Sequence, residues 1–150
     1  MRVIVIGLGI QGNKRAAIAK NALVATVDPV NPKATYKSIQ EVPLQSYDAA
    51  FVCTPDQAKF ELLTYLLSNG KHLLVEKPLL TADNEQIQAL SRIAKSKGAV
   101  CYTAYNHRFE PHIVGMKKIL ESKKLKNETS KLAFALVLDV AGQEVVSDID

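Results

Sequence analysis

Two kinds of hydrophobic pattern alternate along the chain. In one kind, short runs are apolar at nearly every position, as in strands that are buried on both faces of a parallel sheet. In the other, apolar residues recur with the spacing of one face of a helix. Strands that alternate with helices predict an α/β fold with a doubly wound parallel sheet, the three-layer α/β/α arrangement of a Rossmann domain. The predicted strands are Val3–Ile6, Leu23–Val27, Asp48–Thr54, His72–Val75 and Ala99–Thr103, and the predicted helices are Lys14–Lys20, Asp56–Asn69, Ala82–Lys97 and Pro111–Ser122.

Local signals refine this pattern. Thr81 is a favourable cap for the helix that follows it, and Pro111 suits the first turn of a helix. The pattern between the second and third strands is weaker. There, residues 34–38 are predicted to form a short strand, and residues 39–44 a helical turn that Pro43 stops.

The character of the chain changes after Ser122. Residues 125–130 are polar and loop-like, whereas residues 132–140 and 144–149 are apolar enough to form two short strands around a turn. We therefore expect one domain over residues 1–122, followed by a short β-like segment over residues 123–150. The apolar residues of this segment could pair with a second copy of the chain, so a homo-oligomer is left open as a possibility.

A glycine-rich turn joins the first strand to the first helix. Gly7, Gly9 and Gly12 have the spacing of a turn that places a pyrophosphate on a helix amino terminus. The first glycine permits the tight turn, the second lets backbone approach the phosphates, and the third lets helix and strand pack closely. Asp28 ends the second strand about twenty residues further on, where an acid can bind a ribose hydroxyl. The combination predicts a dinucleotide site, with a purely structural turn as the alternative.

The acid also predicts which dinucleotide binds. Asp28 can accept a hydrogen bond from the 2′-hydroxyl of NAD but repels the 2′-phosphate of NADP, and no arginine follows it. Lys33 is a nearby cation that works against this preference. A flavodoxin-like fold without a dinucleotide is disfavoured, because it has no use for this acid. The predicted cofactor contacts in this part of the chain are Gly7, Gly9, Ile10, Gln11, Gly12 and Asp28.

Composition narrows the classes of function. With 47% hydrophobic and 23% charged residues, and no apolar run of membrane-spanning length, we expect a soluble protein with the cytoplasm as its default location. The net charge of +4 comes from lysines near one helix end, without aromatic residues between them to stack on bases, so no nucleic acid partner is expected. These lysines are Lys117, Lys118, Lys123, Lys124 and Lys126.

Two cysteines, Cys53 and Cys101, lie near the ends of predicted strands that have another strand between them. Because neighbouring strands lie about 4.8 Å apart, two steps separate the cysteines by about 10 Å. That distance exceeds the reach of a disulfide. The cysteines and histidines also lack zinc-binding spacing, so no metal site is predicted.

The carboxyl ends of parallel strands meet at one edge of the sheet, and that edge is where ligands of such folds bind. Thr54-Pro55 and Glu76-Lys77-Pro78 follow two of the predicted strands, and residues 105–108 follow the last one. A lysine after a buried strand is usually a solvated cation. Here Glu76 can accept hydrogen bonds from a ribose, and Pro78 restricts the backbone beside Lys77.

With these motifs the chain resembles the Gfo/Idh/MocA oxidoreductases, a family that includes glucose–fructose oxidoreductase and inositol dehydrogenase. The resemblance covers residues 1–122. It implies a nicotinamide-dependent oxidoreductase that acts on a hydroxyl of a sugar, sugar nucleotide or cyclitol. The motifs that carry it are GLGIQG, the acid Asp28, VCTPD at 52–56, GKHLLVEKPL from Gly70 and YNHRFEP at 105–111.

The resemblance also implies roles for individual residues. Lys77 would be the catalytic residue, near the nicotinamide and the substrate, and Glu76 would bind the nicotinamide ribose. Thr54 and Pro55 would lie along the cofactor. Asn106 would lie near the edge where cofactor and substrate meet.

The chain departs from this family in two respects. Lys59 stands where the family often has histidine, which puts a role at that position in doubt. The family also continues into a large substrate domain, of which residues 123–150 resemble a truncated or altered remnant. We therefore expect the 150-residue chain to bind cofactor without turning over a sugar by itself. The alternative is a non-catalytic NAD-binding module or a partner subunit.

Overall fold

The computed structural model describes residues 1–79 and 84–122. The chain forms two compact units, residues 1–104 and residues 105–150, and the second is described as far as Ser122. The expected domain boundary at Ser122 coincides with the end of the described residues, so it stays a prediction. Thr81, the two predicted strands after residue 130 and Lys123, Lys124 and Lys126 lie outside the described residues.

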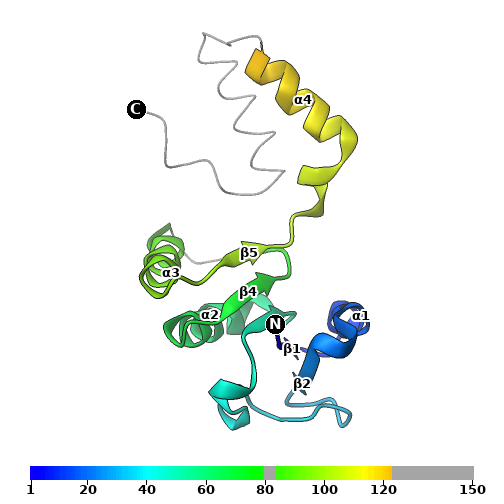
Figure 1. The fold of residues 1–150 in the computed structure, drawn as a ribbon, viewed down its shortest axis with the longest axis vertical. Helices are drawn as coiled ribbons and strands as arrows, with labels where there is room; N and C mark the ends of the chain where they lie inside the picture. The colour runs from blue at the N-terminus through cyan, green and yellow to red at the C-terminus, as the bar shows by residue number, and fades with distance from the viewer. Residues whose placement is uncertain (80–83, 123–150) are drawn as a thin grey trace. The chain divides into compact units, whose positions relative to one another are not determined.

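The first unit is built on one parallel sheet, which confirms the predicted α/β fold (Figure 1). β1, β2 and β4 have the predicted bounds, whereas β3 and β5 are shorter than predicted because flanking residues of their apolar runs lie in the adjoining loops. The strands lie in the order β2-β1-β3-β4-β5. Their bounds are β1 Val3–Ile6, β2 Leu23–Val27, β3 Ala49–Val52, β4 His72–Val75 and β5 Cys101–Thr103.

Three helices of this unit cover the two faces of the sheet. Right-handed crossovers that run in opposite directions from β1 and β3 must place their helices on opposite faces. Figure 1 shows α1 on one side of the strands and α2 and α3 on the other. The three layers therefore follow from the strand order. The bounds are α1 Ile10–Ala19, α2 Lys59–Ser68 and α3 Asn84–Lys97.

Two of these helices begin at different residues than predicted. α1 begins at Ile10 and not at Lys14, because the glycine-rich turn itself supplies the first helical turn. It ends at Ala19, because the next residue, Lys20, has a φ of 48° that is incompatible with a right-handed helix. Residues 56–58 form a separate 3₁₀ turn before α2.

The strand predicted over residues 34–38 is reduced to one bridge. Tyr36 pairs with Val27 in parallel, its N–H donates to Thr26 O at 3.0 Å, and its own carbonyl accepts from Asp28 N–H at 3.0 Å. Tyr36 can be counted as a rudimentary third strand beside β2. When the strands are then renumbered along the chain, so that β3 becomes the fourth, their order in the sheet is the 3-2-1-4-5-6 of dinucleotide-binding folds. The switch point, where chain order reverses, lies between β1 and β3.

The core lies mainly between the sheet and α2 with α3. Leu63, Leu66 and Leu67 are fully buried and belong to one cluster with Val52 and Val75. Each such leucine contributes roughly 1.5–3 kcal/mol through removal from water. This burial fixes the positions of the carboxyl ends of the strands. The candidate site residues follow those ends, so the site requires them to be fixed.

The amino-terminal edge of the sheet has its own lysine anchor. Where one helical turn over residues 39–44 was expected, residues 39–41 and 44–46 form two short 3₁₀ turns with Pro43 between them. Lys71 Nζ donates to Leu44 O at 2.7 Å and to Tyr47 O at 2.9 Å, and it lies 4.8 Å from the ring centre of buried Tyr47. The Lys71 anchor therefore ties β4 to the segment before β3.

The described part of the second unit is short. Residues 106–109 form a 3₁₀ turn, and α4 spans Pro111–Ser122, as the proline signal predicted. The Glu110 carboxylate lies 2.6 Å from His107 Nδ1 and 3.2 Å from His112 Nε2.

Both cysteines are free, in agreement with the strand spacing. Cys53 follows β3, Cys101 lies in β5, and β4 runs between them. Burial raises the pKa of each thiol to about 11. Within residues 1–79 and 84–122, no His, Cys, Asp and Glu side chains gather as a metal site would require, and no helix is long and apolar enough to cross a membrane.

The packing of α1 against the turn after β1 yields a stability test. A Cβ on Gly12 would lie 1.7 Å from Gly7 O, whereas a Cβ on Gly9 meets nothing within 4 Å. Gly12→Ala is expected to lower the free energy of unfolding by at least about 2 kcal/mol, because backbone would have to move. Gly9→Ala is the matched control and should cost about 1 kcal/mol or less. Urea denaturation measures both, and equal losses would contradict the packing described.

Candidate functional site

The turn between β1 and α1 is held tightly against the neighbouring strands. Gly7 N–H donates to Val27 O at 2.8 Å, and Cys53 N–H donates to Ile6 O at 2.8 Å. Gly7 has a φ of 90°, and a Cβ there would lie 2.7 Å from Cys53 O. A side chain at Gly7 is therefore excluded twice, by backbone conformation and by contact with the chain after β3.

The amino terminus of α1 is open beside this turn. Gly9 is its cap residue, and no side chain caps the helix there. The first amides of a helix have no partner within it, so Ile10, Gln11 and Gly12 present N–H groups at this end. Gly9, Ile10 and Gln11 are exposed. Such an end attracts anions through its unpaired N–H groups and the helix dipole.

Asp28 lies at the end of β2 and faces the same turn. Its Oδ2 accepts from Leu8 N–H at 2.7 Å, and its Oδ1 accepts from Val30 N–H at 2.9 Å and Asn31 N–H at 2.8 Å. The hydrogen bond from Asn31 N–H, followed by that from Leu8 N–H, holds the pKa of this carboxyl below its ordinary value. Asp28 is thus an ionised acceptor, and Oδ2 retains room for a further donor.

Two asparagines bond the glycine-rich turn, Asn13 from α1 and Asn31 from the loop after β2. Asn13 Nδ2 donates to Leu8 O at 3.0 Å and to Gly9 O at 2.9 Å. Asn31 Nδ2 approaches Leu8 O at 3.4 Å, and its Oδ1 accepts from Lys33 N–H at 3.0 Å. Leu8 is therefore bonded through both its N–H and its carbonyl, and the two loops form one rigid wall.

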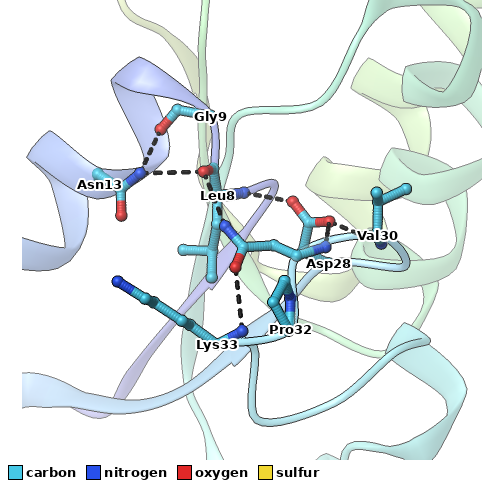
Figure 2. Close-up of a pocket in the computed structure, with 8 residues that line it drawn as sticks. Leu8, Gly9, Asn13, Asp28, Val30, Pro32 and Lys33 are labelled. Atoms are coloured by element: carbon cyan, nitrogen blue, oxygen red, sulfur yellow. Dashed lines mark hydrogen bonds between the residues drawn. The ribbon is translucent and has the colours of Figure 1, made fainter.

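These two loops, with Asn13 of α1, line an open pocket of about 560 Å³ (Figure 2). Its volume is in the range of small-molecule sites. Figure 2 shows the Asp28 carboxylate bonded to Leu8 and the Lys33 side chain on the same wall. The pocket therefore combines one anionic acceptor with one cation. Its lining residues are Leu8, Gly9, Asn13, Asp28, Val30, Asn31, Pro32 and Lys33.

Thr54 and Pro55 follow β3 at the same edge of the sheet. The Thr54 hydroxyl oxygen is buried and has no hydrogen-bond partner within the described part of the chain. A buried hydroxyl without a partner costs free energy, so such an atom calls for an explanation. Pro55 is exposed.

Glu76 follows β4 and is paired with a residue of α1. Its Oε1 accepts from Arg15 Nε at 2.6 Å, and Arg15 Nη2 contacts the same oxygen. The side chains of Arg15 and Glu76 are 21% and 13% exposed, which is low for two charges. Because both guanidinium nitrogens contact Oε1, Oε2 remains able to accept another donor.

Lys77 and Lys59 differ sharply in environment. Lys77 is exposed, and its ammonium has no partner among residues 1–79 and 84–122. Lys59 is 2% exposed, and its Nζ donates to Asp56 Oδ1 at 2.6 Å and to Glu76 O at 2.8 Å. It also donates to Pro78 O. Lys59 therefore binds the backbone of the turn that contains Lys77.

The candidate residues from β1 to β4 lie along the carboxyl edge of one sheet. Gly7–Gly12, Asp28, Thr54-Pro55 and Glu76-Lys77 follow four strands that are adjacent in the order of the sheet. Asn106 is exposed and belongs to the second unit, so its contribution to the site stays a prediction.

Sequence reasoning missed four polar residues: Asn13, Arg15, Asn31 and Lys59. Only Lys59 had a readable signal. It lies on the same helical face as Leu63 and Leu66, and a lysine on a buried stripe needs partners. Arg15 and Asn31 act through contacts between segments far apart in sequence, whereas Asn13 bonds the carbonyls of nearby Leu8 and Gly9.

The chain belongs to the oxidoreductase family with an NAD-binding Rossmann fold, Gfo/Idh/MocA, whose pattern matches residues 1–105. It is 31% identical over 75 residues to the NAD⁺-dependent scyllo-inositol 2-dehydrogenase of Bacillus subtilis, covering 50% of this chain and 22% of that protein. It is 29% identical over 80 residues to the NADP⁺-dependent scyllo-inositol 2-dehydrogenase IolW of the same organism, covering 53% and 22%.

A solved structure of the same kind is UDP-N-acetylglucosamine 3-dehydrogenase GnnA from Acidithiobacillus ferrooxidans. It superposes with a TM-score of 0.69 at 27% identity, over 79% of this chain and 43% of that one. The matched part of the chain thus spans about a fifth of the length of the curated relatives named above. Family membership is established by the first 105 residues.

The hydrogen bonds of Asp28 yield a pH prediction. Because its folded-state pKa lies below the ordinary 3.8, the carboxylate stabilises the fold above that pH, and this contribution is lost as pH falls through the folded pKa. Asp28→Asn is expected to be less stable near neutral pH, because its NH₂ group must face either Leu8 N–H or the N–H groups of Val30 and Asn31. Urea unfolding from about pH 7 to about pH 3 should show a difference from the unmodified chain that is constant above about pH 5 and shrinks below 3.8. A difference that does not change over this range would contradict the assignment.

Proposed function

We propose that this chain is the cofactor-binding domain of an NAD-dependent oxidoreductase. The observation that carries the proposal is the convergence of an open helix amino terminus, an ionised Asp28 and the Glu76-Lys77 turn on one edge of the sheet. Ligands of doubly wound sheets bind at that edge, where the strand order reverses. Two features support the fit to a dinucleotide: the empty space around Gly9 and the unpartnered hydroxyl of Thr54.

Each part of the edge suits one part of the dinucleotide. The pocket beside Asp28 has an acceptor for the hydroxyls of the adenosine ribose. The N–H groups of Ile10, Gln11 and Gly12 suit the pyrophosphate, because Gly9 leaves the backbone uncovered. Glu76 Oε2 is available to the nicotinamide ribose.

In this proposal the edge would hold NAD, which would supply a hydride acceptor or donor for a carbinol carbon of a sugar, sugar nucleotide or cyclitol. The Lys77 ammonium gives a proton to the substrate oxygen or, as a neutral amine, takes one from it. Glu76 orients the cofactor, and the turn around Pro78 sets the direction of Lys77. The inositol dehydrogenases and the sugar-nucleotide dehydrogenase among the relatives support this class of substrate.

A second candidate is a module that binds NAD without catalysis, or as the partner of another subunit. One observation favours it: Lys77 is exposed, and its ammonium has no partner among residues 1–79 and 84–122. A reacting substrate needs an enclosed site that excludes water and fixes its orientation. The two candidates share the same cofactor site and differ in turnover.

The pocket predicts a preference for NADH over NADPH. Asp28 repels a 2′-phosphate, so we expect NADH to bind about tenfold more tightly, as measured by fluorescence titration. Asp28→Ala should weaken NADH binding and narrow the preference, whereas Lys33→Ala is the matched control that should widen it. Tighter binding of NADPH by the unmodified chain would contradict the proposed role of Asp28.

The exposure of Lys77 predicts the activity of the chain by itself. We expect NADH binding without turnover, because lost orientation forfeits roughly 7 kcal/mol of barrier lowering, or about five decades in rate. The measurement follows NADH absorbance with NAD and a panel of sugars, sugar nucleotides and inositols. Saturable turnover that disappears in Lys77→Met, with NADH affinity within a few-fold of the unmodified chain, would reject this expectation and favour an active enzyme.

A further inference from the structure

The ammonium group of Lys59 is almost completely removed from water. Its side chain is 3% exposed, and its three protons have three acceptors: Asp56 Oδ1, Glu76 O and Pro78 O. An ammonium has three donors, so this group is fully satisfied. Burying such a charge is costly, and only complete hydrogen bonding makes it tolerable.

The two carbonyl acceptors have a particular location. They belong to the residues on either side of Lys77, so one ammonium binds the backbone before and after that residue. Glu76 is held at two further points, since its N–H donates to Val52 O at 2.8 Å and its carboxylate accepts from Arg15. The turn therefore has fixed ends, while the Lys77 side chain remains exposed.

We propose that Lys59 is a positioning residue that holds the Glu76-Lys77-Pro78 turn in the geometry required by the nicotinamide half of the cofactor. This inference rests on the function proposed above. Lys59 touches neither cofactor nor substrate in this scheme. It acts through the Glu76 carboxylate, which binds the nicotinamide ribose, and through the direction of Lys77.

The Lys71 anchor provides a matched comparison within the same fold. Lys71 also binds two backbone carbonyls, at 2.7 and 2.9 Å, but at the amino edge of the sheet. Loss of either lysine removes backbone hydrogen bonds and lowers stability. Only loss of Lys59 disturbs the edge at which the dinucleotide is proposed to bind.

The test compares two ligands on folded protein. ADP lacks the nicotinamide riboside, so it probes the Asp28 pocket and the helix amino terminus, whereas NADH also probes the turn at Glu76. Calorimetric titration of Lys59→Met should show NADH affinity about tenfold weaker and ADP affinity within about twofold of the unmodified chain. Lys71→Met should leave the ratio of the two affinities unchanged. Circular dichroism verifies that each variant is folded.

A purely structural role predicts a different result. If Lys59→Met weakens the binding of NADH and ADP equally, or weakens the binding of neither, the inference is overturned. The proposed cofactor site is not affected by that result. Binding of neither ligand by the unmodified chain would overturn the proposed function and the inference with it. If Lys59→Met does not fold, the ratio of NADH affinity to ADP affinity is measured on Lys59→Gln, which removes the charge but keeps a polar end. The same outcomes then support or overturn the inference.

Discussion

The close contact between Gly12 and Gly7 is the constraint on which the site depends. The position of a Cβ on Gly12 lies 1.7 Å from Gly7 O, so α1 can approach the end of β1 only without a side chain there. This approach puts the helix amino terminus at the carboxyl edge of the sheet. It also brings Arg15, further along α1, within 2.6 Å of Glu76 after β4. The absence of a side chain at Gly12 thus positions both the helix amino terminus, proposed to bind the pyrophosphate, and Glu76, proposed to bind the nicotinamide ribose.

The charged residues of this edge are fixed by backbone and by one another. Three N–H groups hold the Asp28 carboxylate, Arg15 holds Glu76, and buried Lys59 holds the carbonyls beside Lys77. Charges that are arranged before a ligand arrives need little reorganisation when it binds. Lys77 is the exception, because its side chain is exposed in the middle of a turn whose two ends are fixed.

The strands, most helices and the glycine-rich turn could be located from the sequence, because each depends on residues that are close together along the chain. Apolar runs located the strands, and the spacing of Gly7, Gly9 and Gly12 located the turn. The pairing of Arg15 with Glu76 spans 61 positions, and those of Lys59 with the carbonyls of Glu76 and Pro78 span 17 and 19, so no local pattern encodes them. The strand expected over residues 34–38 became a single bridge, because a weak apolar run does not specify its hydrogen bonds.

The central claim is that the carboxyl edge of the sheet binds a dinucleotide, with adenosine beside Asp28 and nicotinamide beside Glu76. Backbone amide NMR spectra of the chain, recorded with ADP and then with NADH, test it most directly. The account predicts that both ligands shift the amides of Leu8, Gly9 and Ile10, and that only NADH shifts those of Glu76 and Lys77. Shifts confined to the amino edge around Tyr47, or identical shifts with both ligands, would contradict it.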